Sequence, residues 1–159
     1  MARIEALELI EKLSSASLSV VLAESCTAGL AADLIVQVPG ASRVFWGSFV
    51  CYSIAAKQRM LGVDHELILR HGVVSEETAC AMAEGALARS GADLAAGVTG
   101  LAGPGGDGSV PAGTVWIGVA GRGGKSRGLV FHYTGSRNEV RLAAALDTLR
   151  ELIRNIHKI

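Results

Sequence analysis

The sequence predicts a single α/β domain over residues 1–159, a three-layer α/β/α sandwich with a mixed sheet. Strand-like and helix-like patterns alternate along the 159 residues without a composition shift, a low-complexity tract or an internal repeat. Half of the residues are hydrophobic, only 4% are aromatic, and mean hydropathy is +0.38, which indicates a core of small side chains. Two late strand patterns around a short glycine-rich turn predict a hairpin, and a hairpin makes such a sheet mixed.

The first half of the chain contains two strand patterns, each followed by helix. An amphipathic helix opens the chain, with apolar side chains at Ala6, Leu9, Ile10 and Leu13. The elements expected next are a strand around 18–22, a helix over 30–38 closed by Pro-Gly, a strand over 44–52, a helix capped by Ser53 and ended by Gly62, and a short helix over 64–71.

The second half contains the remaining three strands and two long helices. The elements expected are a helix that begins at Ser75, a strand over 93–98, a glycine-rich loop over 99–108, hairpin strands over 114–120 and 129–133, and a last helix from about Ser136. Ligands of open α/β sheets bind beyond the carboxyl ends of the strands. We therefore expect Ser25, the Tyr52 region and the Thr99 loop to meet at one edge of the sheet.

Charge and cysteine usage exclude several classes of function. The 15 basic and 15 acidic residues cancel, so neither nucleic acid nor a membrane is expected as a partner. Cys26, Cys51 and Cys80 are widely spaced, and the four histidines show no ligand spacing, so no metal is expected. No cofactor is expected either. Unpaired thiols, together with the absence of a signal-peptide pattern, favour a cytoplasmic protein.

The segment Ala23–Gly29 is the first candidate for chemistry. It lies where a strand pattern gives way to a helical one, which would place Ser25, Cys26 and Thr27 beside the unpaired N–H groups of a helix N-terminus. A hydroxyl there can act as a nucleophile, and backbone N–H groups around Cys26 and Thr27 can stabilise an oxyanion. An N-cap needs only one serine or threonine, and the local sequence alone favours that simpler interpretation.

Lys57 is the candidate base. It follows Tyr52 by five residues, about one turn into a helix that Ser53 is expected to cap, and its neighbours over 54–56 are apolar or small. Partial desolvation would lower the lysine pKa and let the amine accept a proton from a serine, while Tyr52 would relay a proton or fix the lysine by hydrogen bonding. An isolated lysine on a short helix is more often a solvated surface residue, and only its coincidence with Ser25 and Tyr52 favours catalysis.

Two further segments suit an anionic ligand. The loop that contains Thr99, Gly100 and Gly103 offers unobstructed backbone N–H groups for a phosphate or a planar ring. Arg137 stands at the start of the last helix, where a cation opposes the helix dipole unless an anion binds as well. The alternatives are a tight connection for the loop and a solvated side chain for the arginine.

A series of short motifs spans the chain from about residue 4 to residue 155. They are Ala-Glu-Ser-Cys-Thr-Ala-Gly at 23–29, Pro-Gly-Ala-Ser at 39–42, Tyr-Ser-x-x-Ala-Lys at 52–57, Leu-Gly-Val at 61–63, Gly-Val-Val-Ser-Glu-Glu at 72–77, Val-Thr-Gly-Leu-Ala-Gly-Pro-Gly-Gly at 98–106 and Pro-Ala-Gly-Thr-Val at 111–115. In this order the motifs closely resemble the CinA C-terminal domain family, the nicotinamide-nucleotide amidohydrolases (nicotinamide mononucleotide deamidases). The first and sixth motifs are highly specific as a pair.

This resemblance implies a serine–lysine amidohydrolase that converts nicotinamide mononucleotide to nicotinic acid mononucleotide and ammonia without a metal. It places the family's serine on Ser25, its lysine on Lys57, its tyrosine on Tyr52 and the threonine of its glycine-rich loop on Thr99. Because the chain starts at the first helix, it is expected to be the stand-alone form of the family.

The resulting hypothesis is a hydrolase of pyridine mononucleotides. Ser25 attacks the amide, Lys57 transfers the proton, and Tyr52 assists. The residues expected to contact the substrate are Cys26, Thr27, Thr99, Gly100, Gly103 and Arg137, with Arg137 preferred for the phosphate. Besides this small molecule, a homo-oligomer of the chain is compatible with the sequence.

One segment departs from the family pattern. The family usually has Thr-Tyr-Ser-Asn-Glu-Ala-Lys, whereas this chain has Cys-Tyr-Ser-Ile-Ala-Ala-Lys at 51–57, so the polar groups at Cys51, Ile54 and Ala55 are lost. The loss keeps open a second hypothesis, a pyridine-nucleotide-binding or partner-binding module with weak or absent catalysis. A third alternative uses Cys26 as the nucleophile, although no histidine pairs recognisably with it.

Overall fold

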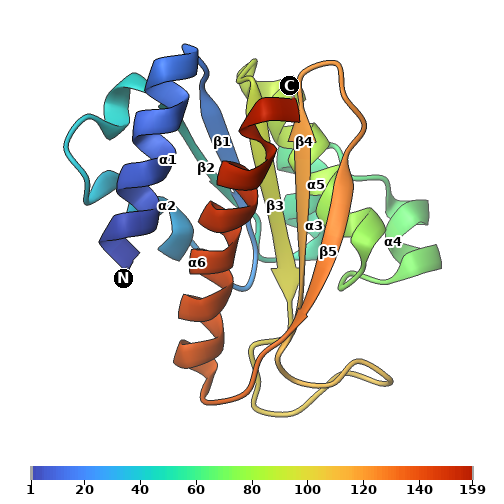
Figure 1. Ribbon diagram of the computed structural model, residues 1–159. Helices are drawn as coiled ribbons and strands as arrows, with labels where there is room; N and C mark the ends of the chain where they lie inside the picture. The colour runs from blue at the N-terminus through green and yellow to red at the C-terminus, as the bar shows by residue number, and fades with distance from the viewer. Residues whose placement is uncertain (1, 159) are drawn as a thin grey trace.

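A five-stranded mixed sheet forms the centre of the computed structural model, which describes residues 2–158 (Figure 1). Its strand order is β2-β1-β3-β4-β5, where β1 pairs in parallel with β2 and β3, and the β3–β4 and β4–β5 pairs are antiparallel. The strands are β1 (Val20–Glu24), β2 (Phe45–Val50), β3 (Leu94–Gly100), β4 (Thr114–Gly121) and β5 (Arg127–His132). The predicted mixed sheet with a late hairpin is confirmed.

Helices cover both faces of this sheet, so the predicted three-layer sandwich is confirmed as well (Figure 1). One face carries α1 (Ala2–Ala16), α2 (Leu30–Val36) and α6 (Arg137–Asn155), and the other carries α3 (Ile54–Leu61), α4 (His65–His71) and α5 (Glu76–Ser90). Two 3-10 turns complete the elements, η1 (Ala41–Arg43) and η2 (Ile156–Lys158). Within residues 2–158, no helix has the length and apolar character needed to cross a membrane.

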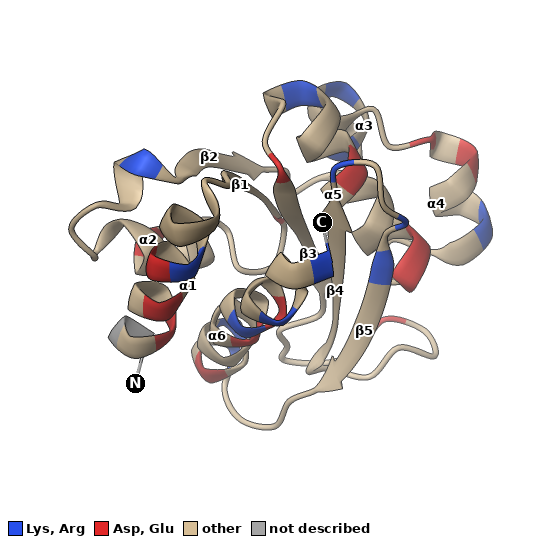
Figure 2. Ribbon diagram, turned by 45° about the horizontal axis from the view of Figure 1, so that its top comes forward, with Lys and Arg blue, Asp and Glu red and all other residues tan. Residues whose placement is uncertain are grey.

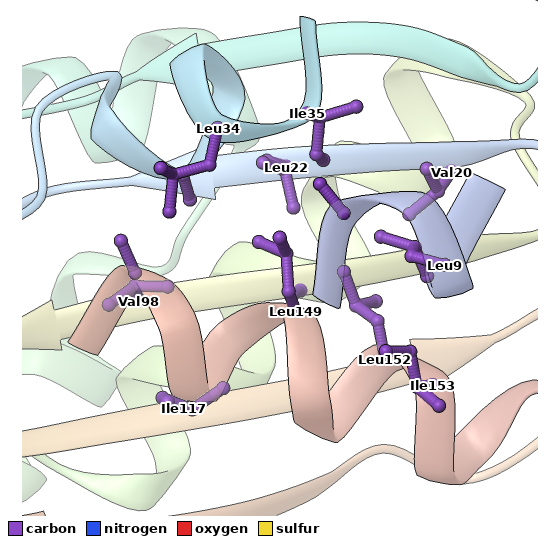
Figure 3. Packing of buried hydrophobic residues seen from close by; sticks show 14 of the residues in the cluster. Leu9, Val20, Leu22, Leu34, Ile35, Val98, Ile117, Leu149, Leu152 and Ile153 are labelled. Carbon is purple, nitrogen blue, oxygen red and sulfur yellow. The ribbon is translucent and has the colours of Figure 1, made fainter. Parts of the chain in front are cut away.

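The larger core lies between the sheet and the α1–α2–α6 layer. Figure 3 shows Leu22, Val98 and Ile117 of the sheet packed near Leu149 and Leu152 of α6. Successive side chains of β1 alternate between the two faces, and every residue of that strand is buried, as expected for a central parallel strand. The sheet that carries the site is therefore anchored on both sides.

Glycine lets α5 approach the sheet closely on the second face. A Cβ added to Gly97 would lie 2.2 Å from the carbonyl oxygen of Ala79, and one added to Gly118 would lie 2.5 Å from the carbonyl carbon of that residue. Because neither clash involves a movable side chain, larger residues at these positions would push the helix away from the sheet. The small residues in the sequence thus serve close helix–sheet packing.

Ser53 and Ser75 cap helices as the sequence predicts, Ser136 caps the last helix, which was predicted to start near it, and Ser25 caps none. Ser53, Ser75 and Ser136 accept hydrogen bonds from backbone N–H groups in the first turns of α3, α5 and α6. The N-cap interpretation of Ser25 is wrong, because α2 starts five residues later with Gly29 at its cap position. The strand before the glycine-rich loop is also longer than predicted, since β3 extends through Gly100 and the loop begins at Leu101.

Charged side chains of both signs are mixed along the outer helices. Figure 2 shows Lys and Arg interspersed with Asp and Glu on α1, α4 and α6. The mixture agrees with a net charge of zero for the whole chain.

Candidate active site

The carboxyl ends of the three parallel strands meet at one cavity, as the sequence predicts. Ser25 directly follows β1, the segment 51–52 follows β2, and Thr99 lies near the end of β3. Ser25, Tyr52 and Thr99, together with the loop at 101–106, line a cavity of about 370 Å³, a size typical of small-molecule sites. In Figure 1 the β3–β4 loop and the start of α6 lie at this same end of the sheet.

Lys57 and Ser25, which both line this cavity, are in direct contact. Lys57 Nζ lies 2.9 Å from Ser25 Oγ, 2.9 Å from the carbonyl oxygen of Cys51 and 3.2 Å from that of Tyr52. The lysine is only 1% exposed, so it is not the solvated surface residue that an isolated lysine on a short helix would be.

Burial favours the neutral form of Lys57, which can accept a proton. Desolvation lowers the pKa of its ammonium below the ordinary value, and it outweighs the opposite effect of the nearby Cys51 and Cys26. No carboxylate within residues 2–158 forms an ion pair with it. A neutral amine has two hydrogens and one lone pair, and carbonyls only accept, so the two carbonyls would direct the lone pair at Ser25.

The backbone after Ser25 leaves two N–H donors without an oxygen acceptor. Ser25 N–H donates to Val98 O at 3.0 Å, and Ala28 N–H donates to Ser25 O at 3.1 Å. The N–H groups between them, those of Cys26 and Thr27, donate to no oxygen within residues 2–158, and the acceptor beside them is the Cys26 sulfur, whose pKa they lower. Sulfur is a weak acceptor, so two N–H groups beside a nucleophile with no stronger partner suit an oxyanion.

Glu24 holds this segment by replacing the missing helix cap. Its buried carboxylate accepts the N–H groups of Gly29, Ala31 and Ala32 at 3.0–3.1 Å and the Ser48 hydroxyl at 2.9 Å. Sequence reasoning missed this role, because an acid at the end of a strand pattern does not reveal which helix start it reaches.

The Cys26 thiol is a poor nucleophile in this environment. Burial raises the pKa of Cys26 to about 11, although the N–H groups of Cys26 and Thr27 act in the opposite direction. A thiol with that pKa is protonated near neutral pH. Lys57 also contacts the hydroxyl of Ser25, which favours serine over cysteine as the nucleophile.

Tyr52 contacts the lysine through its backbone and Arg137 through its side chain. The carbonyl of Tyr52 accepts from Lys57, whereas its hydroxyl accepts from Arg137 Nη2 at 3.1 Å, and the residue is 61% exposed. Arg137 Nη1 also donates to Gly103 O at 2.7 Å. The tyrosine hydroxyl and the guanidinium therefore lie together at the rim of the cavity. Among the described residues, the Tyr52 hydroxyl makes no hydrogen bond to Lys57, although the sequence led us to expect one.

The remaining predicted contacts differ in how they meet the cavity. Thr99 lines it and donates its hydroxyl to Val73 O at 2.8 Å. Gly100 also lines it, but a Cβ there would lie 2.7 Å from Thr114 O, so strand packing explains this glycine. Thr27 is fully buried outside the lining, and only its backbone is adjacent to the site.

Sequence reasoning did not single out two further groups, one in the cavity lining and one behind it. Val73 and Val74, between α4 and α5, line the cavity. Arg141 of α6 donates from Nε to Cys26 O and from Nη2 to Thr27 O, each at 3.0 Å. No local signal could have revealed Arg141, because more than 100 residues separate it from its partners.

The residues that depart from the family pattern do not touch the lysine with their side chains. Cys51 contacts Lys57 through its carbonyl, and its thiol contacts Phe49 O and Met60 Sδ. Ile54 and Ala55 are exposed on α3. The lysine contacts therefore do not depend on the three replaced side chains.

Within residues 2–158, no cluster of three or more His, Cys, Asp or Glu side chains could hold a metal ion.

Comparisons with known proteins agree on one family. The model of the CinA C-terminal domain matches residues 4–156. A CinA-like protein of Akkermansia muciniphila is 47% identical over 147 residues, which cover 87% of this chain but 36% of that protein. The chain thus spans about a third of the length of the curated relatives it matches.

Solved structures share the whole fold. The competence/damage inducible protein CihA of Agrobacterium tumefaciens is 39% identical, covers 96% of this chain and 94% of its own, and superposes with a TM-score of 0.92. A competence-damaged protein (CinA) superfamily protein of Klebsiella pneumoniae is 28% identical, with coverage of 100% and 99% and a TM-score of 0.95.

Proposed function

The chain belongs to the CinA C-terminal domain family, and we propose that it is a serine–lysine amidohydrolase that converts nicotinamide mononucleotide to nicotinic acid mononucleotide and ammonia. The observation that carries the proposal is the buried Lys57 Nζ, 2.9 Å from Ser25 Oγ and hydrogen-bonded to two carbonyls. The choice of substrate follows from the motifs in the sequence, and the cavity of about 370 Å³ is compatible with a pyridine ring and its ribose.

The first half of the reaction forms an acyl-enzyme. Neutral Lys57 accepts the Ser25 proton as Oγ attacks the carboxamide carbon, and the resulting oxyanion accepts from the N–H groups of Cys26 and Thr27. Lys57 then returns the proton to the leaving nitrogen as the C–N bond breaks, so that ammonia leaves and the nicotinoyl group remains on Ser25.

The second half repeats these steps with water. Lys57 takes a proton from a water molecule as its oxygen attacks the acyl carbon, and the same N–H groups stabilise the second oxyanion. The C–Oγ bond then breaks, Ser25 recovers its proton from Lys57, and nicotinic acid mononucleotide leaves.

Arg137 is the proposed phosphate ligand. The phosphate of a mononucleotide carries about two negative charges near neutral pH, with a second pKa near 6, and this neutral chain must balance them locally. The Arg137 guanidinium lines the cavity, donates to two neutral oxygens, and forms no ion pair within the described part of the chain. A dianion there would also offset the unfavourable position of the arginine at the start of α6. Thr99 and Gly100 would then contact the ring or the ribose.

Ammonia release tests the proposal directly. Purified protein is incubated with nicotinamide mononucleotide, ammonia and nicotinic acid mononucleotide are quantified, and Ser25→Ala serves as the blank. We expect both products in equal amounts from the wild type only. Tight mononucleotide binding without ammonia, unaffected by Ser25→Ala, would instead indicate the non-catalytic binding module. Retention of activity by Ser25→Ala and its loss in Cys26→Ala would favour the thiol.

The phosphate assignment has its own test. Arg137→Ala should raise KM for nicotinamide mononucleotide, since charge-assisted bonds to a phosphate are lost. Turnover of bare nicotinamide, where it is accepted, should change far less because it has no phosphate. An equal loss on both substrates would show that Arg137 is not a phosphate ligand.

A further inference from the structure

Arg141 is the one arginine of α6 whose hydrogen bonds, within the described residues, end on the backbone next to the nucleophile. Its Nε donates to Cys26 O and its Nη2 to Thr27 O, each at 3.0 Å, while Nη1 donates to Asn138 Oδ1 at 3.2 Å. Nε and Nη2 form one edge of the guanidinium, so the pair of bonds fixes two successive carbonyls in one orientation. None of the ion pairs among residues 2–158 includes Arg141, so no carboxylate there competes with these carbonyls for its charge.

Fixing the carbonyls also fixes the neighbouring donors. In a trans peptide the C=O and the N–H of the next residue point in opposite directions. With Cys26 O directed at Arg141, the Thr27 N–H must point away from α6. That N–H and the N–H of Cys26 lie on the side of the Cys26 thiol, whose pKa they lower, and Cys26 lines the cavity beside Ser25.

We propose that Arg141 is the positioning residue of the oxyanion hole: it holds the Cys26–Thr27 peptide so that its N–H faces the oxygen of the carbonyl that Ser25 attacks. The inference rests on the proposed serine–lysine chemistry, but not on the identity of the substrate. Without the arginine, this peptide could turn and direct its carbonyl into the cavity. Arg141 has no contact with the reacting atoms itself, so its effect should fall on kcat rather than on KM.

The test uses two measurements on the full chain. The first is kcat and KM for ammonia release from nicotinamide mononucleotide. The second is the rate at which an alkyl fluorophosphonate labels Ser25. In that reaction the Oγ–P bond forms, the P–F bond breaks, fluoride leaves, Lys57 takes the serine proton, and the phosphoryl oxygen occupies the oxyanion position. Labelling thus tests the oxyanion hole whatever the natural substrate is.

Arg141→Met should lower both kcat and the labelling rate on the order of 10²-fold, because a displacement of catalytic groups by about 1 Å has an effect of that size. KM should stay close to the wild-type value. Arg141→Lys should recover part of the rate, because an ammonium can still donate to at least one of the carbonyls. Arg150→Met is the matched control: Arg150 lies on the same helix and binds Asp147 and Glu5, so its loss should lower the unfolding temperature without slowing the labelling.

Several outcomes would overturn the inference. They are unchanged labelling of folded Arg141→Met, equal slowing by Arg150→Met, or no labelling of the wild type, which would remove the nucleophile as well. Labelling that depends on Arg141 in a protein that releases no ammonia would instead reject the proposed substrate and retain the role of Arg141. If Arg141→Met does not fold, Arg141→Lys and Arg141→Gln carry the same comparison, with the lysine variant expected to label faster.

Discussion

Two strand-to-helix junctions of this sheet, β1–α2 and β2–α3, contain similar residues and use them differently. Each places a serine between a strand and a helix, Ser25 after β1 and Ser53 after β2. Ser53 accepts from the N–H of Ala56 and caps α3. Ser25 caps nothing, because Gly29 occupies the cap position of α2 and the carboxylate of Glu24 accepts the N–H groups there.

The difference shows how a hydroxyl is kept free for chemistry. The hydroxyl oxygen of a capping serine accepts a hydrogen bond from the backbone, as that of Ser53 does. At the β1–α2 junction Glu24 takes over that task, so Ser25 Oγ remains available to Lys57. The Ser53 cap has a complementary role, because it starts the helix that carries Lys57 to Ser25. One junction supplies the nucleophile, and the other positions its base.

Ser25→Ala should produce the largest contrast between the two serines. Removal of a catalytic nucleophile costs on the order of 10⁶ in kcat in a comparable hydrolase, and no helix cap is lost here. We expect ammonia release to fall to the background rate, with the unfolding temperature close to that of the wild type. Substantial turnover by Ser25→Ala would show that both serines are structural.

Lys57→Arg should have the next largest effect. Arginine stays protonated, so it cannot act as the base, and general-base catalysis contributes roughly 10²–10⁴-fold. We expect kcat to fall within that range while mononucleotide binding, measured by calorimetry, is largely kept. Wild-type turnover by the arginine variant would show that Lys57 contributes only a positive charge and does not act as a base.

The pH dependence sharpens this assignment. Because burial lowers the pKa of Lys57, kcat/KM of the wild type should rise with pH through that pKa. Between that pKa and about 10.4, the value of an exposed lysine, the unfolded chain binds more protons than the folded one, so stability rises with pH. The free energy of unfolding of the wild type, measured relative to Lys57→Met, should therefore increase across this window, and a flat difference would contradict a buried base.

Glu24→Gln tests whether the Glu24 carboxylate, by accepting the N–H groups at the start of α2, leaves the Ser25 hydroxyl available to Lys57. The amide replaces one accepting oxygen with a donor that would face other donors, so we expect a loss of about 1–3 kcal/mol in the free energy of unfolding and a lower kcat. Asp93→Asn is the matched control, because Asp93 accepts from the N–H and the hydroxyl of Ser19 at the opposite end of β1. Both variants should be destabilised, but only Glu24→Gln should lose activity.

The same two junctions mark how far the sequence could be interpreted. The spacing of apolar residues and the capping residues predicted the helices correctly, including the cap at Ser53, because these signals are local. The meeting of the strand ends was also predictable, since parallel strands present their carboxyl ends at one edge. The roles of Glu24 and Arg141 were not, because one depends on how the backbone turns after β1 and the other on α6 reaching back more than 100 residues.

Ser53→Ala should have the smallest effect. Loss of a serine cap costs about 1 kcal/mol, which corresponds to a fall of about 2–4 °C in the unfolding temperature for a chain of this size. Because Lys57 keeps its bonds to the carbonyls of residues 51 and 52, kcat should stay close to the wild-type value. Ser15→Ala, which removes an exposed hydroxyl that caps nothing, is the control and should change neither quantity. A folded Ser53→Ala protein as inactive as Ser25→Ala would show that the first turn of α3 places Lys57 so tightly that capping and catalysis cannot be separated at the β2–α3 junction.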